Sequence, residues 1–214
     1  MRVSFFGKTG VLTFALLVCS STAFSGVPEG YVPYDGLKDQ FTIALPEGWS
    51  AYNQNQALSG RSGSSGMVFF TAQAITKEGE KTADPNLLSQ VDTGAIPSFF
   101  VDRQPAVKGM SCAKFTKTAS YDLGVKITKD PIFGAARSYF AATPIHHDDV
   151  SIGGCQGVHY KGEGKKGEWV LDVRAVSDGR VLYLFSLRNK AENFAKNVDT
   201  YEKAIGTVQI TRHE

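Results

Sequence analysis

The densest group of potential metal ligands is the run His-His-Asp-Asp at residues 146–149, with His159 close by in the sequence. A metal such as zinc needs about three or four nitrogen, sulfur or oxygen ligands that converge on one point. Neighbouring residues of a β-strand point to opposite faces, so His146 and His147 would not easily chelate one ion together. We therefore favour a solvated loop after Pro144 over a metal site, and we assign no metal ligand.

A second group of residues has the types that nucleophilic catalysis needs. Cys112 or Cys155 could supply the nucleophile, while His159 could act as the base and Asp172 could orient its ring. This chemistry requires a thiolate beside an imidazole, and no sequence motif brings these residues together. We expect no catalytic residue, and we keep as the alternative a hydrolase-type enzyme whose site is assembled from scattered residues such as His159 and Asp172.

Two glycine-rich segments could contact an anion or a charged partner. Residues 59–66, rich in serine and glycine, could cradle an anion through backbone N–H groups, but they lack the lysine and the strand-loop-helix context of a phosphate loop. Residues 161–167 carry charges between glycines and are typical of a solvated hairpin tip rather than a basic contact patch. We expect a flexible loop at the first segment and no bound cofactor.

The first 25 residues have the order of parts of a secretory signal peptide. Arg2 and Lys8 precede an uncharged apolar run at residues 11–19, and small or polar residues follow at 20–25. The apolar run is shorter than the roughly 20 residues that a helix needs to cross a bilayer. We therefore expect a cleaved signal, a periplasmic or secreted protein, and no transmembrane segment in the mature chain.

The signal could be processed at three positions. Cleavage after Ala23 or after Ser25 satisfies the preference for small residues, and we favour the second. Lipoprotein processing at Cys19 is disfavoured because the bulky Val18 precedes it. The choice matters because a lipid at Cys19 would tether the protein to a membrane.

The expected net charge of the mature chain is near zero. Removal of Arg2 and Lys8 with the signal lowers the basic count from 23 to 21, which equals the 21 acidic residues. A mature net charge near zero argues against binding to nucleic acid or to an anionic membrane surface.

Two cysteines, Cys112 and Cys155, remain after removal of the signal, 43 residues apart. In an oxidising compartment such a pair indicates a disulfide, whereas the other reading is two separate buried thiols. Closing a loop of this length could stabilise the fold by roughly 2–4 kcal/mol. We expect the disulfide.

The elements that must position these residues alternate between strands and helices. We expect strands at residues 40–46, 49–52, 67–74, 138–143, 154–162, 168–177 and 180–187. We expect a helix that begins at Pro85 and places Leu88, Val91, Ala95 and Phe99 on one face, bent or restarted at Pro97, and a second helix at 190–205. Residues 111–129 are ambiguous, although Phe115, Ala119, Leu123 and Ile127 recur at a spacing that suits a helix.

The turn at Asp178-Gly179 joins the clearest hairpin of the chain. Short turns between strands indicate an antiparallel sheet, and helices grouped in sequence pack on its faces, so the expected class is α+β. We expect an extended lead-in at residues 26–39 and one domain at 40–214. Trp169, Tyr183 and Phe185 are typical of a strand core rather than a ligand platform.

Both ends of the expected domain resemble one known family. Residues 39–49 read Asp-Gln-Phe-Thr-Ile-Ala-Leu-Pro-Glu-Gly-Trp, an alternating strand followed by Leu-Pro-x-Gly-Trp. Residues 183–187, Tyr-Leu-Phe-Ser-Leu, and residues 201–208, Tyr-Glu-Lys-Ala-Ile-Gly-Thr-Val, form the tail. The chain thus resembles the PsbP-like superfamily, which includes DcrB-like bacterial periplasmic proteins. No functional residue is carried over, because no functional motif of the family is matched.

The resemblance implies an antiparallel sheet with flanking helices and an accessory, binding or assembly role more than catalysis. We therefore expect an exported, non-enzymatic accessory or binding protein of the cell envelope, with an envelope protein or a small ligand as its partner. The alternatives are the hydrolase-type enzyme and a metal-binding envelope protein.

Overall fold

The computed structural model describes residues 26–35, 41–53, 67–76, 83–129, 146–163 and 167–211. Its elements in chain order are β1 (Tyr31–Asp35), β2 (Phe41–Pro46), β3 (Ser50–Asn53), β4 (Val68–Thr71), α2 (Pro85–Thr93), β5 (Ser98–Pro105), α3 (Lys117–Lys129), β6 (His146–Ile152), β7 (Cys155–Glu163), β8 (Trp169–Ser177), β9 (Val181–Lys190), α5 (Ala191–Gly206) and β10 (Gln209–Ile210). The predicted signal peptide, the 59–66 loop and the strand expected at 138–143 lie outside these ranges.

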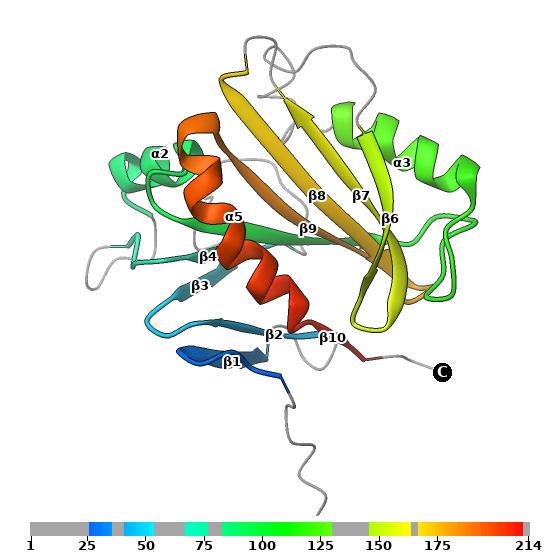
Figure 1. Cartoon of the computed structure of the whole chain (residues 1–214), viewed down its shortest axis with the longest axis horizontal. Helices are drawn as coiled ribbons and strands as arrows, with labels where there is room; N and C mark the ends of the chain where they lie inside the picture. Colours follow the sequence, from blue (N-terminus) through cyan, green and yellow to red (C-terminus); the bar gives the residue numbers. More distant parts are fainter. Residues whose placement is uncertain are drawn as a thin grey trace, which may run out of the picture.

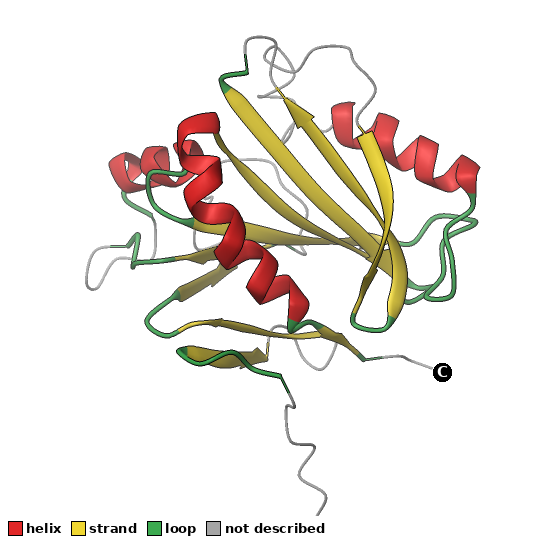
Figure 2. Cartoon of the chain, viewed as in Figure 1, coloured by secondary structure: helices red, strands yellow, loops and turns green. Residues whose placement is uncertain are grey.

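The strands form two antiparallel sheets, shown in Figures 1 and 2. The larger sheet has seven strands in the order β3-β4-β5-β9-β8-β7-β6. The smaller sheet has the order β1-β2-β10, and a parallel bridge between Gly153 and Gln209 connects it to the β6–β7 turn. With α2, α3 and α5 packed around these sheets, the chain is α+β, as the sequence predicts.

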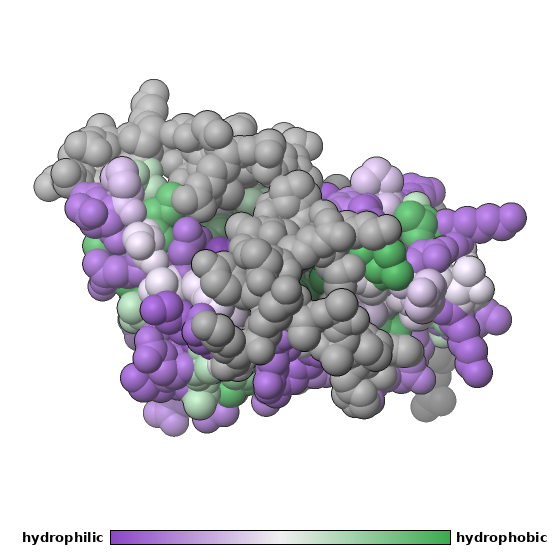
Figure 3. All heavy atoms as spheres, turned by 90° about the horizontal axis from the view of Figure 1, so that it is seen from above, coloured by the Kyte–Doolittle hydropathy of each residue, from purple (hydrophilic) through white to green (hydrophobic). Residues whose placement is uncertain are grey.

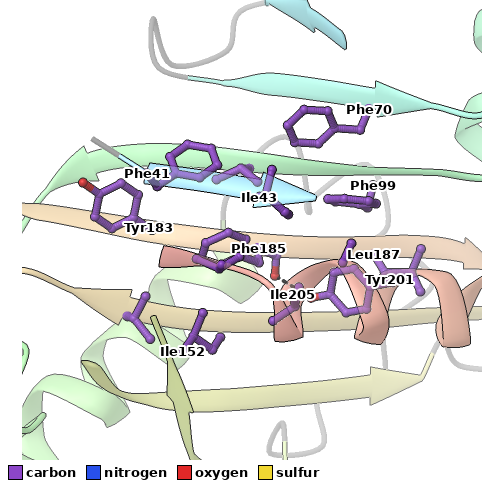
Figure 4. Close-up of a cluster of buried hydrophobic side chains, with 14 of the residues drawn as sticks. Phe41, Ile43, Phe70, Phe99, Ile152, Tyr183, Phe185, Leu187, Tyr201 and Ile205 are labelled. Carbon is purple, nitrogen blue, oxygen red and sulfur yellow. Dashed lines mark hydrogen bonds between the residues drawn. The ribbon is translucent and has the colours of Figure 1, made fainter. Parts of the chain in front are cut away.

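The largest core lies between the seven-stranded sheet, α5 and β2 (Figure 4). Phe41 of β2 places its ring 5.9 Å from that of Tyr183 and 6.1 Å from that of Phe185, both edge to face. Phe99 of β5 lies 5.6 Å from the ring of Tyr201 on α5. Tyr183 and Phe185 are fully buried, which agrees with their predicted place in the core.

The opposite face of the same sheet packs against α3. Ala119, Leu123 and Ile127 of α3 are buried in a second apolar cluster that includes β7 and β8 residues. The hydroxyl of Tyr160 donates a hydrogen bond to the carbonyl of Ser120. The helical spacing within residues 111–129 therefore marks a real helix, which begins at Lys117.

Helix α2 ends earlier than the sequence predicts. Asp84 caps its first turn by accepting a hydrogen bond from the Asn86 backbone, but Gly94 adopts φ +77° and ends the helix after Thr93. The expected continuation to Phe99 is wrong, because Ser98–Pro105 is strand β5. This strand lies between β4 and β9 and contributes Phe99 to the main core.

Two further strands occupy segments for which the sequence predicts other structure. Part of the expected lead-in is β1, which pairs with β2. The run at residues 146–149, for which a loop is expected, belongs to edge strand β6 and pairs with β7 over its whole length. The predicted hairpin at Asp178-Gly179 is present, with Gly179 at φ +98° and Asp178 Oδ1 accepting from the N–H of Val181.

The surface of the described residues carries few large exposed apolar side chains. They are Val32, Val107 and Tyr121, from β1, the β5–α3 connection and α3. Seen from above, hydrophilic side chains predominate among the coloured residues, with small separate hydrophobic patches (Figure 3). Within the described ranges, no helix has the length and apolar character of a membrane span.

Candidate functional site

The structure brings together two residues that the sequence names as a candidate pair, His159 on β7 and Asp172 on β8. His159 Nε2 lies 2.8 Å from Asp172 Oδ2. The Asp172 side chain is 3% exposed and that of His159 is 19% exposed. A carboxylate this deeply buried needs hydrogen-bonded or charged partners, so the contact with His159 matters for the fold whatever else it does.

Arg174 extends this pair into a network that reaches helix α5. Its Nε lies 3.5 Å from Asp172 Oδ1, and its Nη2 lies 2.8 Å from Glu202 Oε1. Its guanidinium also lies 5.3 Å from the centre of the Tyr201 ring, within the range of a cation–π contact. Four side chains from β7, β8 and α5 thus form a continuous polar cluster: His159, Asp172, Arg174 and Glu202.

The register of the sheet explains why these side chains meet. His159 pairs with Arg174 directly across β7 and β8, and Asp172 lies two residues from Arg174 on the same strand face. Val170 and Val176 on that face of β8 belong to the main core under α5. The polar residues therefore interrupt an otherwise apolar stripe at the place where α5 crosses the sheet.

The electrostatics of the cluster are visible in two pKa shifts. Burial raises the pKa of Tyr201 well above its usual value, and the negative charge of Asp172 adds to the shift. Burial lowers the pKa of Arg174, but its interactions with Tyr201, Asp172 and Glu202 outweigh this effect and raise it overall. Tyr201 stays neutral and Arg174 stays charged across the physiological pH range.

Lys161 lies next to the cluster on β7. Its Nζ is 5.3 Å from the centre of the Phe194 ring on α5. The residue pairs with Asp172 across β7 and β8, so it shares the face that packs on α5. Of the charged segment at residues 161–167, residues 164–166 lie outside the described ranges, and Lys161 belongs to a strand rather than to a hairpin tip.

Cys112 and Cys155 form a disulfide, as the sequence predicts. Cys155 begins β7 and is fully buried, while Cys112 lies in the connection between β5 and α3. The N–H of Gln156 also donates to the carbonyl of Cys112 at 2.8 Å, so covalent and hydrogen bonds hold this connection against β7. In the disulfide neither sulfur is a thiolate, so this structure places no cysteine nucleophile beside His159.

The candidate metal ligands at residues 146–149 lie on edge strand β6. Asp148 pairs with His159 and Asp149 with Val158, so the two carboxylates belong to opposite faces of the sheet. In the ranges that the structure describes, no three His, Cys, Asp or Glu side chains are grouped to hold a metal ion.

Sequence reasoning identified His159 and Asp172 but missed Arg174 and Glu202. Asp172 and Arg174 alternate with apolar residues inside β8, and a buried pair of opposite charges in an apolar strand is a usable signal. Glu202 could not be found in this way, because it lies on the exposed side of an amphipathic helix and reaches Arg174 only in the folded chain. Trp169, expected in the core, is only partly buried, and Arg188 lies 5.9 Å from its ring centre.

No protein-family model matches this chain, and no curated protein matches it by sequence. Among solved structures, it is similar to the cyanobacterial PsbP protein of Synechocystis sp., with a TM-score of 0.54 and 15% identity over 85% of this chain and 92% of that chain. A structure of LpqN, a Mycobacterium tuberculosis protein involved in cell envelope biogenesis, gives a TM-score of 0.44 and 14% identity over 85% and 90% of the two chains. A Bacteroides thetaiotaomicron structure gives a TM-score of 0.42 and 12% identity, over 85% of this chain and 48% of that chain. The similarity to cyanobacterial PsbP over most of both chains shows that this chain has a PsbP-like fold.

Proposed function

We propose that this chain is an exported accessory protein of the cell envelope that acts by binding another envelope component rather than by catalysis. The observation that carries the proposal is the disulfide between Cys112 and Cys155 in a PsbP-like fold. Disulfides form and persist in oxidising compartments and are rare in the cytosol. The pattern of a secretory signal at residues 1–25 independently supports the same compartment.

The contacts of the polar cluster explain it as a structural feature that needs no catalytic role. Each charge in it has an opposite charge in the protein, because Asp172 contacts His159 and Arg174, and Arg174 contacts Glu202. The chain of contacts runs from β7 through β8 to α5. Such a network can hold the helix on the sheet and requires no substrate to balance its charge.

The hydrolase-type enzyme remains a second candidate because of one observation, the 2.8 Å contact between His159 Nε2 and Asp172 Oδ2. A carboxylate bound to an imidazole orients the ring and stabilises its protonated form, as in catalytic triads. In this reading the other ring nitrogen, Nδ1, would serve as the base. His159→Gln separates the two candidates, because the amide keeps an N–H donor toward Asp172 but has no titratable base.

Capture in the native envelope tests the proposal. The tagged wild-type chain and His159→Gln are produced in the native cells, cross-linked in place, and their partners identified by mass spectrometry. We expect both proteins to retain the same envelope partner at the same yield. Recovery of cytoplasmic partners only, or a hydrolytic activity of the wild type that His159→Gln abolishes, would contradict the accessory role.

A further inference from the structure

The seven-stranded sheet ends on one side at β6, and this edge differs from the others in the described chain. Strand β3 has four residues, β10 has two, and β1 contains Pro33, which has no N–H to offer. Strand β6 has seven residues without proline or glycine, and within the described ranges it pairs only with β7. Short strands, proline and charged side chains protect edges from pairing, and of these β6 has only charged side chains.

The turn between β6 and β7 fixes which backbone groups of β6 point outward. Gly153 and Gly154 both have positive φ, 59° and 76°, as in a two-residue type I′ hairpin turn. In such a hairpin the flanking residues, Ile152 and Cys155, exchange hydrogen bonds with each other. Alternation along the strand then turns the N–H and C=O of Asp149 and Ser151 away from β7, toward the open edge.

Strand pairing and the disulfide hold this edge in an extended form without a partner. All seven residues of β6 pair with β7, β7 pairs with β8, and the disulfide fixes Cys155 at the start of β7. A rigid template loses little conformational entropy on binding, so hydrogen bonds formed along it contribute more of their strength to affinity.

The charge on β6 indicates which kind of strand would pair with its open edge. Asp149 is exposed, lies at the centre of β6, and has its own N–H and C=O turned toward the open edge. A cation directly across from Asp149 stabilises the pair, whereas a like charge destabilises it. A second copy in the register that pairs all seven residues would place Asp149 opposite Asp149. A basic strand is therefore favoured over self-association.

We propose that β6 binds an extended, lysine- or arginine-bearing polypeptide segment that adds a strand to the seven-stranded sheet. This inference rests on the proposed function and names the surface and chemistry of the partner. Main-chain hydrogen bonds at Asp149 and Ser151 supply the affinity, and the carboxylate of Asp149 supplies the preference for a cation.

The test uses the mature chain, residues 26–214, and a fluorescent peptide of alternating lysine and valine. Two matched probes accompany it: the same peptide with alternate amides N-methylated, which keeps its charge but removes its donors, and a glutamate–valine peptide. Binding is measured by anisotropy, and amide hydrogen exchange locates the site. We expect binding of the first peptide only, with slowed exchange at the amides of Asp149 and Ser151.

Asp149→Lys should weaken binding of the lysine peptide about tenfold. Asp199→Lys, the same charge change at an exposed position of α5, should leave binding unchanged. Equal binding of the N-methylated peptide, no binding of the lysine peptide, or exchange protection elsewhere would overturn the inference. So would a dimer, seen by sedimentation, that protects the same amides without peptide. If the lysine peptide does not bind but the envelope partner is still captured, only this inference is overturned and the proposed function stands.

Discussion

His159 Nε2 lies 2.8 Å from Asp172 Oδ2, although the two residues pair with other partners across β7 and β8. His159 is opposite Arg174, and Asp172 is opposite Lys161, so the contact runs diagonally across the strand pair. The other carboxylate oxygen of Asp172, Oδ1, lies near Arg174, and Arg174 forms an ion pair with Glu202 on α5. Removing different members of this network should therefore have unequal effects.

Asp172→Asn should lower the free energy of unfolding by roughly 3–5 kcal/mol, because it leaves the Arg174 guanidinium without its buried counter-charge. Glu202→Gln is the matched control. Glu202 is 53% exposed and its ion pair is partly screened by water, so its loss should cost less than about 1 kcal/mol. Urea denaturation measures both changes in the free energy of unfolding. Equal effects of the two variants would show that the burial of Asp172 does not strengthen its contribution to stability.

Loss of the disulfide should destabilise the protein by roughly 2–4 kcal/mol, because Cys112 and Cys155, 43 residues apart, close a loop in the unfolded chain. The comparison is between oxidised wild type and the double variant Cys112→Ala, Cys155→Ala. Reducing agent should lower the urea midpoint of the wild type and leave the double variant unchanged. A wild type that does not respond to reduction would contradict this account.

Gly94→Ala should be much more destabilising than Gly179→Ala. Both glycines have positive φ, 77° and 98°, which costs an alanine about 1–2 kcal/mol. At Gly94 a new Cβ would also lie 1.8 Å from Asn189 Oδ1, whereas at Gly179 nothing lies within 4 Å. Thermal denaturation of both variants separates the steric clash from the backbone cost, and equal melting temperatures would show that Asn189 moves away freely.

Alkaline pH should unfold the protein through its buried tyrosines. Burial, with the nearby charge of Asp178, raises the pKa of Tyr183 to about 12, and burial also raises the pKa of Tyr160 and Tyr201. The unfolded chain ionises near pH 10, so this contribution to stability is complete below that pH and is lost as the pH rises toward about 12.

Absorbance at 295 nm measures tyrosinate directly. Part of the rise in tyrosinate absorbance should occur only as the near-ultraviolet circular dichroism is lost. Tyr183→Phe should make this late rise smaller. Complete ionisation near pH 10 with the fold intact would contradict the burial of these rings.

Local signals in the sequence predict part of this fold. The hairpin at Asp178-Gly179 follows from turn chemistry, α5 from its apolar spacing, and the disulfide from the parity of the cysteines left after removal of the signal. Each of these depends on residues close in sequence or on the compartment. Each could therefore be found without knowledge of the tertiary structure.

The sequence patterns did not predict strands β5 and β6, because pairing with neighbouring strands determines the structure of both segments. Phe99 fits the helical spacing from Leu88, and only the left-handed Gly94 and the pairing of β5 with β9 settle the segment as a strand. Strand β6 begins with four polar residues and lacks the alternation of a half-buried strand. It forms because the Gly153-Gly154 turn and β7 provide its hydrogen bonds.

The polar cluster was predicted only in part for the same reason. His159 and Asp172 could be named by residue type, but their contact depends on the β7–β8 register. Glu202 joins them only because α5 crosses the sheet at this point.

The location and covalent state of the chain isolated from its native cells test the central claim most directly. Fractionation followed by intact-mass measurement reports the N-terminus, any lipid and the cysteine redox state together. The exported accessory role predicts a chain in the envelope or the medium that begins at Gly26, or at Phe24, with Cys112 and Cys155 oxidised. A cytoplasmic chain that retains residues 1–25 and carries reduced cysteines would contradict it.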